Sequence, residues 1–255
     1  MTDSPDETRA RELLRAWDSQ QAAYITHREA RFEVMLDALA SAITPGSTVL
    51  DLACGPGSLA QRVLRRFDSV RVVAVDYDPL LLELGRHALA EFGDRVEFID
   101  VDLVDPDWMT ALPSARIDAV ASSTALHWLA PPVLTRLYQD LGRLLPPGGV
   151  FLNGDHLRLS DGRRLFAELA AADDRRSQER GRADGAMTWD EWFPAAMASG
   201  PWAAHGPERE RRFADRPPTP DLSVDFHVDA LRVGGFVEAG TAWQHYDDYV
   251  ILAQR

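Results

Sequence analysis

The sequence predicts an α/β fold built on a doubly wound, mostly parallel sheet. Short apolar runs rich in β-branched residues alternate with longer stretches of helical periodicity, which is the pattern of repeated strand–helix units. The first of these units carries a glycine loop between its strand and its helix. A chain of 255 residues can bury one full α/β core with room for an insertion, but not comfortably two large domains.

The composition argues against several classes of protein. The sequence has 40 acidic and 27 basic residues, and all of the basic residues are arginine. The resulting formal charge of -13 does not suit a nucleic-acid binder. Cys54 is the single cysteine, so neither a disulfide framework nor a cysteine zinc site is expected. The N-terminus lacks the apolar core of a signal peptide, and no apolar run approaches the roughly 20 residues that span a bilayer. We therefore expect a cytoplasmic protein without a membrane partner.

The first strand–helix unit reads Val-Leu-Asp-Leu-Ala-Cys-Gly-Pro-Gly-Ser-Leu-Ala, and the chain is organised around it. Gly55 and Gly57 carry no Cβ, so the backbone can approach a ligand closely. A dinucleotide-binding turn also fits, with Asp76 near the offset of its ribose acid. Asp51 and Pro56 argue against a pyrophosphate, because one adds negative charge and the other removes a backbone N–H. A cofactor with a cationic head fits the loop better.

The elements carry recognisable start and stop signals. Leu59, Val63 and Phe67 recur every four residues after the glycine loop, and Asp78 followed by Pro79 has the chemistry of a helix start. The sequence contains few helix breakers between residues 8 and 41. It thus predicts helices at 8–41, 59–67, 79–92, 131–145 and 224–233. The predicted strands are at 49–52, 70–75, 96–99, 117–123, 150–153 and 249–253, with a further strand that begins at residue 236.

The pattern Asp-x-x-x-Gly-x-Gly, formed here by Asp51, Gly55 and Gly57, is the first motif of class I S-adenosylmethionine-dependent methyltransferases, and the chain resembles that family. The Ala-Leu-His-Trp segment at 125–128 is similar to the fourth-strand exit of the small-molecule branch of trans-aconitate and ubiquinone-pathway type. A helix ending in Leu-Leu-x-Pro-Gly-Gly, at 144–149, is another signature of the family.

The resemblance covers residues 45–155 specifically and 228–254 moderately. It implies a seven-stranded sheet with a reversed terminal strand, S-adenosylmethionine as the cofactor, and methyl transfer to a small-molecule acceptor. We expect one methyltransferase domain over residues 1–255. Its parts are N-terminal helices at 1–44, a cofactor-binding core at 45–155, an inserted cap at 156–226, and a terminal helix and strand hairpin at 227–255.

The inserted segment is rich in arginine pairs, tryptophans and prolines, and it is too apolar for a disordered linker. We interpret it as a helical cap over the substrate site. Most of its arginines are expected on solvated helical faces with acidic partners one turn away, although an acidic substrate could use one or two.

The resemblance also assigns a cofactor site residue by residue. Asp76 would accept from the ribose hydroxyls, Asp102 from the adenine amino group, and the backbone N–H of Leu103 would meet a ring nitrogen. Tyr77 offers an aromatic face to the adenine, or is a partly exposed turn residue, whereas Asp78 starts a helix. The other cofactor contacts are expected from the first loop and the fourth-strand exit, at Asp51, Ala53, Gly55, Gly57 and Ser123.

In the family that the chain resembles, N-terminal helices close over the cofactor, so Tyr24 and Arg28 could reach the methionine carboxylate. The alternative is an amphipathic helix packed across the sheet edge, with Arg28 and Arg31 solvated.

Methyl transfer from a sulfonium is an in-line displacement, and it needs a general base only if the acceptor holds its proton at neutral pH. His156 follows the fifth strand and is the leading candidate for that base. Asp155 could orient it and contact the substrate, although neighbours on an extended chain point to opposite sides. His127 is the second candidate, and Trp128 could wall the site. Alternatively, His127 satisfies a backbone carbonyl and Trp128 packs under the next helix.

The histidines His27, His205, His227 and His245 show no metal-site spacing, so no metal is expected. The favoured function is methyl transfer to a small-molecule acceptor, at oxygen, by a monomer or homodimer. Alternatives are a cofactor-dependent cyclisation or decarboxylation, and a cofactor-binding protein without catalysis. A dehydrogenase that uses NAD is a further alternative. The sequence does not identify the acceptor.

Overall fold

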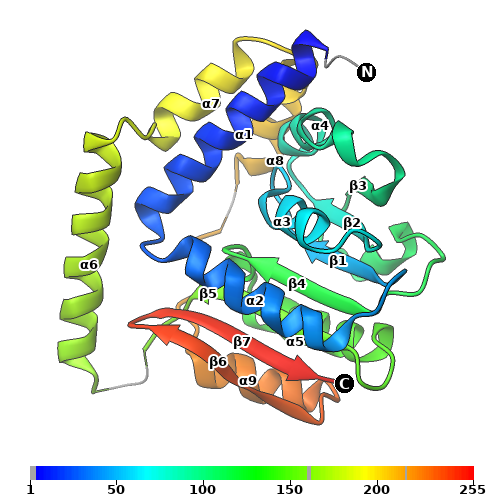
Figure 1. Ribbon diagram of the computed structural model, residues 1–255. Coiled ribbons are helices and arrows are strands. Elements are labelled where there is room, and N and C mark those ends of the chain that lie inside the picture. The colour runs from blue at the N-terminus through cyan, green and yellow to red at the C-terminus, as the bar shows by residue number, and fades with distance from the viewer. Residues whose placement is uncertain (1–3, 160–161, 216) are drawn as a thin grey trace.

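The computed structural model describes residues 4–159, 162–215 and 217–255, and these form one seven-stranded sheet in the order β3-β2-β1-β4-β5-β7-β6 (Figure 1). β7 pairs antiparallel with both β5 and β6, and the other strand pairs are parallel. The predicted mostly parallel sheet with a reversed terminal strand is therefore confirmed. The strands are β1 (Thr48–Leu52), β2 (Arg71–Asp76), β3 (Val96–Asp100), β4 (Ala119–Ser123), β5 (Val150–His156), β6 (Glu238–His245) and β7 (Asp248–Gln254).

Helices cover both faces of this sheet (Figure 1). Strand side chains alternate between the two faces: Val72 and Ala74 join one apolar core, and Val73 and Val75 join the other. The first core is covered by α1 (Pro5–Tyr24), α2 (Arg28–Ala42), α3 (Ser58–Arg66) and α4 (Pro79–Ala88). The second is covered by α5 (Pro131–Leu144) and α9 (Val224–Val233), with the short turn η2 (Trp108–Ala111). Two further short turns are η1 (Ala90–Arg95) and η3 (Leu126–Trp128).

The N-terminal segment forms two helices, α1 and α2, which confirms the predicted N-terminal helices, although the sequence did not indicate the break between them. The break comes at Ile25, which has an extended backbone with φ of -123° and a side chain that is only 1% exposed. Burying this β-branched side chain stabilises the break, because the chain must leave the helical path to place it in the core. The turn lets α1 cross towards α4 while α2 packs against β5 and β7.

The segment after β5 is helical, as predicted, and it wraps around α1 (Figure 1). Its first helix stands beside α1, the next runs along α1, and the last two elements pack against α4. The insertion therefore spans from the β5 end of the sheet to the β2 end. Its elements are α6 (Arg164–Ala183), α7 (Trp189–Met197), η4 (Pro201–His205) and α8 (Gly206–Phe213).

Two tryptophans anchor the insertion to the body. Trp192 and Trp202 are fully buried, and Trp192 Nε1 donates to the carbonyl of Leu13 on α1 at 3.1 Å. Trp202 Nε1 donates to the carbonyl of Ala196 at 2.9 Å. Each indole thus buries a large apolar area while its one polar group stays paired.

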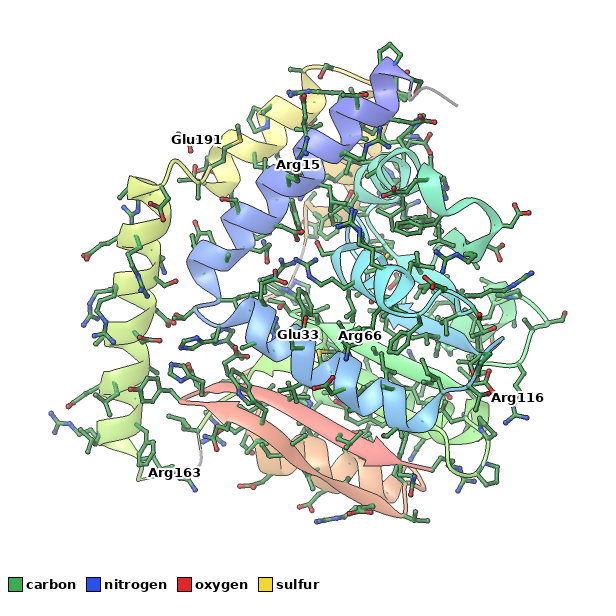
Figure 2. All side chains as sticks on the ribbon, in the orientation of Figure 1. Arg15, Glu33, Arg66, Arg116, Arg163 and Glu191 are labelled. Atoms are coloured by element: carbon green, nitrogen blue, oxygen red, sulfur yellow. The ribbon has the colours of Figure 1, made fainter. Side chains whose placement is uncertain are left out.

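The arginines of the insertion mostly lie at the surface. Arg164 pairs with Glu168, Arg176 with Asp173, and Arg211 with Glu208, each pair one helical turn apart. Figure 2 shows Arg163 and Glu191 pointing away from the body of the protein. The predicted solvated helical faces with acidic partners are confirmed for these pairs. No helix among the described residues is long and apolar enough to cross a membrane.

The buried indole of Trp192 provides a test of this packing. We expect Trp192→Ala to lower the free energy of unfolding by about 3–5 kcal/mol, because it leaves a cavity in the core. Urea denaturation of both proteins measures the loss. Trp189, whose side chain is 41% exposed on the same helix, is the matched control. An equal loss in Trp189→Ala would contradict the anchoring role of Trp192.

Candidate active site

The glycine loop after β1 has the backbone that the sequence predicts for close approach to a ligand. Ala53, Gly55 and Gly57 have positive φ values of 52°, 55° and 89°. A Cβ on Gly57 would lie 3.0 Å from the ring of Phe98, so only glycine fits there without displacing that ring. A Cβ on Gly55 would lie 3.7 Å from Trp17, which places α1 directly over the loop. Positive φ at the non-glycine Ala53 is strained backbone of the kind that clusters at ligand sites.

The carboxyl group of Asp51 connects the two elements that flank the glycine loop. Asp51 lies in β1 with its side chain 2% exposed, and its Oδ2 accepts from the backbone N–H of Ala60 in α3 at 3.0 Å. Burial raises the pKa of Asp51 to about 8, against the hydrogen bond from Ala60, which lowers it. This carboxyl group ties the strand to the helix on either side of the loop.

Asp76 is the last residue of β2, the strand next to β1, and Asp102 follows the end of β3, the strand beyond β2. The two oxygens of Asp76 accept from the backbone N–H groups of Gly55 and Asp78, at 2.7 and 2.8 Å. Burial raises the pKa of Asp76 to about 6 despite these donors. Asp102 accepts from the backbone N–H of Val104 at 2.8 Å and closes its own turn.

The neighbours of these acids lie under the insertion. Tyr77 is half-buried, with its ring 5.7 Å from that of Phe213 and the Arg212 guanidinium 4.9 Å from its centroid. Asp78 accepts from the N–H groups of Leu80 and Leu81, which confirms it as the cap of α4.

The remaining residues predicted for the cofactor site take the following places. Leu103 is buried, and its carbonyl accepts from Arg136 at 3.0 Å. Ser123 ends β4, and its Oγ accepts from Arg31 at 2.9 Å. Tyr24 is half-buried at the last residue of α1.

Asp18 on α1 is a member of the site that the sequence did not indicate. Its Oδ1 accepts from Arg28 at 2.7 Å and from the hydroxyl of Ser58, at the start of α3, at 2.6 Å. Its other oxygen accepts from Arg62 at 3.3 Å. Burial alone would raise the pKa of Asp18, but Arg28 and Arg62 outweigh it and lower the pKa. These bonds fasten α1 over the glycine loop. The acid stands amid an ordinary helical pattern, so no local signal marks it.

Arg28 and Arg31 are both buried, so the expectation that they are solvated is wrong. Arg31 is fully buried and donates to Asp248 of β7 at 2.8 Å. It also donates to the hydroxyls of Ser123 and Thr124 at the end of β4. Its Nε has no partner among the described residues. Arg31 therefore ties α2 to two strands of the sheet, and its spacing in the sequence resembles that of a surface arginine.

His127 and Asp155 form a close pair where β4 and β5 end. The Nδ1 of His127 lies 2.6 Å from Oδ1 of Asp155, whose Oδ2 accepts from the backbone N–H of His127 at 3.1 Å. Asp155 is fully buried, and burial would raise its pKa, but His127 outweighs that effect and the pKa is lowered. Asp155 therefore pairs with the side chain of His127 and not with that of His156, whereas its predicted contact with the substrate stays a prediction. Neighbours on the extended β5 point to opposite sides, and the carboxylate meets His127.

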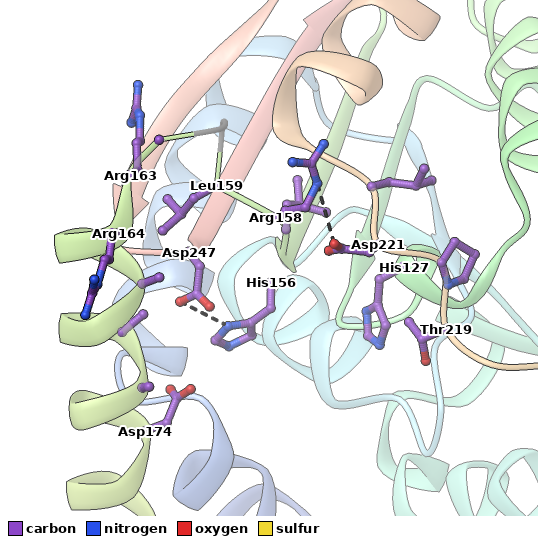
Figure 3. Close-up of a pocket in the computed structure, with 17 residues that line it drawn as sticks. His127, His156, Arg158, Leu159, Arg163, Arg164, Asp174, Thr219, Asp221 and Asp247 are labelled. Atoms are coloured by element: carbon purple, nitrogen blue, oxygen red, sulfur yellow. Dashed lines mark ion pairs between the residues drawn. The ribbon is translucent and has the colours of Figure 1, made fainter.

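A cavity of about 690 Å³ opens beside this pair (Figure 3). His127 and Thr219 lie on one wall, and the α6 residue Asp174 lies across from them. Arg158, Arg163 and Arg164 are also among the residues that surround the cavity. It is therefore enclosed partly by the insertion and partly by the strand ends.

His156 lines the same cavity and is the last residue of β5. Its Nδ1 lies 3.7 Å from Asp247, and its buried Nε2 has no hydrogen-bond partner among the described residues. Burial lowers the pKa of His156, but Asp247 and Asp248 outweigh it and the pKa is raised. Trp128 is 39% exposed, with its ring 4.9 Å from that of His127.

Comparison with known families matches residues 49–149 to the family described as "Methyltransferase domain". The match spans the glycine loop and the strand ends with their acids. Residues 49–149 thus match a methyltransferase domain, which supports the predicted class of S-adenosylmethionine-dependent methyltransferases.

Curated relatives match the methyltransferase domain over about half of this chain. A trans-aconitate 2-methyltransferase of Azoarcus is 34% identical over 135 residues, which cover 52% of this chain and 48% of that protein. A carboxy-S-adenosyl-L-methionine synthase of Pseudomonas paraeruginosa is 31% identical over 46% of this chain and 47% of that one. This chain thus matches no more than about half of either relative's length.

Solved structures of methyltransferases share the fold. Human N-acetylserotonin methyltransferase, solved with S-adenosylmethionine, has a TM-score of 0.57 at 17% identity and covers 92% of this chain and 54% of its own. A putative O-methyltransferase of Nostoc punctiforme has a TM-score of 0.58 at 16% identity, covering 93% and 60%. These likenesses confirm the predicted class of fold.

The buried carboxyl of Asp51 makes stability depend on pH. Its pKa is about 8 when folded, whereas an unfolded aspartate has a pKa near 4, so the folded state holds a proton that the unfolded chain releases. Stability is therefore lost as pH rises through this window, by about 1.4 kcal/mol per pH unit at most. We expect Asp51→Asn to remove this part of the slope between about pH 6 and 8.

Urea denaturation at three pH values across that window measures the slope. The exposed Asp68, changed to Asn, is the control and should keep the wild-type slope. Identical pH dependence in the wild type and Asp51→Asn would refute the raised pKa.

Proposed function

We propose that this protein transfers a methyl group from S-adenosylmethionine to an oxygen atom of a small-molecule acceptor. The observation that carries the proposal is the His127–Asp155 pair, which lies at the edge of a cavity of about 690 Å³ beside a methyltransferase core. An oriented imidazole is what an oxygen acceptor with a bound proton requires.

The residues after β1 and β2 fit the proposed cofactor. A carboxylate has room for more than two hydrogen bonds, so Asp76 can accept from ribose hydroxyls while Gly55 and Asp78 still donate to it. Such donors would relieve the cost of its burial. Asp102 after β3 is positioned by its own turn towards the same edge of the sheet. The other proposed contacts are those predicted from the sequence, at Tyr24, Arg28, Asp51, Ala53, Gly57, Tyr77, Leu103 and Ser123.

When bound, S-adenosylmethionine supplies an electrophilic methyl group on a sulfonium sulfur. The chain itself excludes water and positions the cofactor and the acceptor. Trp17 covers the glycine loop, and Asp18 links α1 to the start of α3, so the N-terminal helix shields this region. Water exclusion favours a reaction in which charge is dispersed. Arg28 has four N–H donors beyond the one that meets Asp18, and these suit the carboxylate of the cofactor's methionine part.

His127 is the base that we propose for the acceptor. Asp155 holds its Nδ1, so the opposite nitrogen, Nε2, is the one that can take a proton from an acceptor hydroxyl. The ionised carboxylate also stabilises the imidazolium that forms. His156 is the second candidate, because it lines the same cavity.

The cavity supports a small acceptor. Its volume falls within the range of about 300–1,000 Å³ that is usual for sites of small molecules. Its lining residues include three arginines (Arg158, Arg163, Arg164) and three aspartates (Asp174, Asp221, Asp247), and Arg158 pairs with Asp221. The lining is therefore of mixed charge. Trp128, packed against the ring of His127, is proposed as a wall of the acceptor site.

Cofactor binding tests the first part of the proposal. We expect Asp76→Ala to weaken binding of S-adenosylhomocysteine by about 5- to 150-fold, because charged hydrogen bonds to the ribose would be lost. Calorimetric titration measures the affinity. The exposed Asp94, changed to Ala, is the control and should bind as the wild type does. Unchanged affinity in Asp76→Ala would count against its ribose role.

Turnover tests the assignment of the base. With a panel of phenols, alcohols and carboxylic acids, we expect release of S-adenosylhomocysteine in proportion to methylated product. His127→Gln should then lower kcat by about 10²–10⁴-fold, with cofactor affinity retained. Asp155→Asn should also lower kcat, because the imidazole loses its orienting partner.

His156→Gln is the matched comparison, since this residue lines the same cavity. The larger loss is expected in His127→Gln, and the reverse order would transfer the role to His156. Cofactor binding without methylated product on any acceptor of the panel would contradict the proposed activity.

A further inference from the structure

Three side chains that are far apart in the sequence meet where α6 lies against the body. His27 stands at the turn between α1 and α2, Asp173 lies on α6, and His245 ends β6. Their nearest ligand atoms all lie within 4.8 Å of one another. The Nε2 of His245 is 3.0 Å from Oδ2 of Asp173, and the two imidazole rings are 4.2 Å apart, edge to face.

The spacing of this trio is close to that of ligands around one metal ion. Nitrogen and oxygen ligands at about 2.1 Å from a tetrahedral zinc ion lie about 3.4 Å apart. His245 Nε2 and Asp173 Oδ2 are 3.0 Å apart, within a few tenths of an ångström of that separation, and the ligand atom of His27 lies within 4.8 Å of theirs. His27 is exposed, so its ring has room to turn towards the pair.

The surroundings also suit a cation. A small cavity of about 10 Å³ beside the trio has room for roughly a single water molecule or ion. The acids Asp174 and Asp247 line the cavity together with the trio. Arg176, which pairs with Asp173, is the nearby positive group, but it meets Oδ1 and leaves Oδ2 facing His245.

We propose that His27, Asp173 and His245 bind a divalent transition ion of the zinc class. Two imidazoles and a carboxylate are ligands that Zn²⁺ and Co²⁺ prefer, and three protein ligands leave a position for water in the small cavity. On binding, the ion replaces the hydrogen bond between His245 Nε2 and Asp173 Oδ2; a neutral His245 then carries its proton on Nδ1, and a protonated one releases a proton to solvent.

The ion would link helix α6 of the insertion to the turn between α1 and α2, which carries His27, and to the end of β6, which carries His245. α6 also contributes Ala167, Ala170 and Asp174 to the wall of the cavity that holds His127 and His156. Occupancy of the trio would therefore hold one wall of that cavity in place. The inference does not depend on the acceptor or on the methyl transfer.

Metal binding by the full chain, without an affinity tag and after dialysis against a chelator, tests the proposal. We expect Zn²⁺ to bind in a one-to-one ratio by calorimetry and to raise Tm, because an ion that binds only the folded state stabilises it. Co²⁺ as a substitute should give a visible absorption band that saturates at the same ratio.

His27→Gln and His245→Gln should each weaken Zn²⁺ binding by more than about tenfold, since even outer partners of a metal site contribute that much. His27 is exposed, so its replacement tests binding with the least risk to folding. The control His205→Gln, which removes a histidine outside the trio, should bind as the wild type does. Absence of saturable binding, or equal affinity in His27→Gln and the wild type, would overturn the proposal.

Discussion

One guanidinium with no access to water sits where three parts of the chain meet. Arg31 of α2 donates to Asp248 of β7 and to Ser123 and Thr124 at the end of β4. A charge removed from water costs several kcal/mol unless its partners are in place, so these groups must come together in the folded state. The need to pair the buried charge of Arg31 determines where α2 crosses the sheet. It also holds together the ends of β4 and β7 on either side of β5, which carries the buried acid of the candidate active site.

Four acids around the site fall into two groups, which differ in their hydrogen-bond donors and in the direction of their pKa shifts. Asp51 and Asp76 have backbone N–H groups as hydrogen-bond donors, and burial raises the pKa of both. Asp18 and Asp155 face arginine or histidine side chains, which outweigh burial and lower the pKa. Asp51 and Asp76 beside the glycine loop thus have no ion-pair partner among the described residues, and a cofactor with positive charge would favour their ionised forms. The imidazole of His127, in contrast, lies against a carboxylate that remains ionised.

The insertion connects the two ends of the carboxyl edge of the sheet. Near β5, α6 lines the cavity that contains both candidate bases and contributes Asp173 to the histidine trio. Near β2, Arg209 of α8 pairs with Asp78 at 2.6 Å and Arg212 with Asp100 at 2.7 Å. Between them, Trp192 and Trp202 bury their rings against the N-terminal half of the fold. A single segment therefore contacts both the proposed cofactor region and the proposed acceptor cavity.

The sequence by itself determined the type and order of the core elements, the glycine loop, the helix start at Asp78, and the acids at three strand ends, because these features depend on residues close together in the chain. It did not indicate the break at Ile25, since burial of one side chain in the assembled core stabilises it. Only the tertiary structure decided which charged groups meet. It buried Arg31, paired Asp155 with His127, and joined His27, Asp173 and His245, because these partners come from elements that are adjacent only once the sheet is assembled.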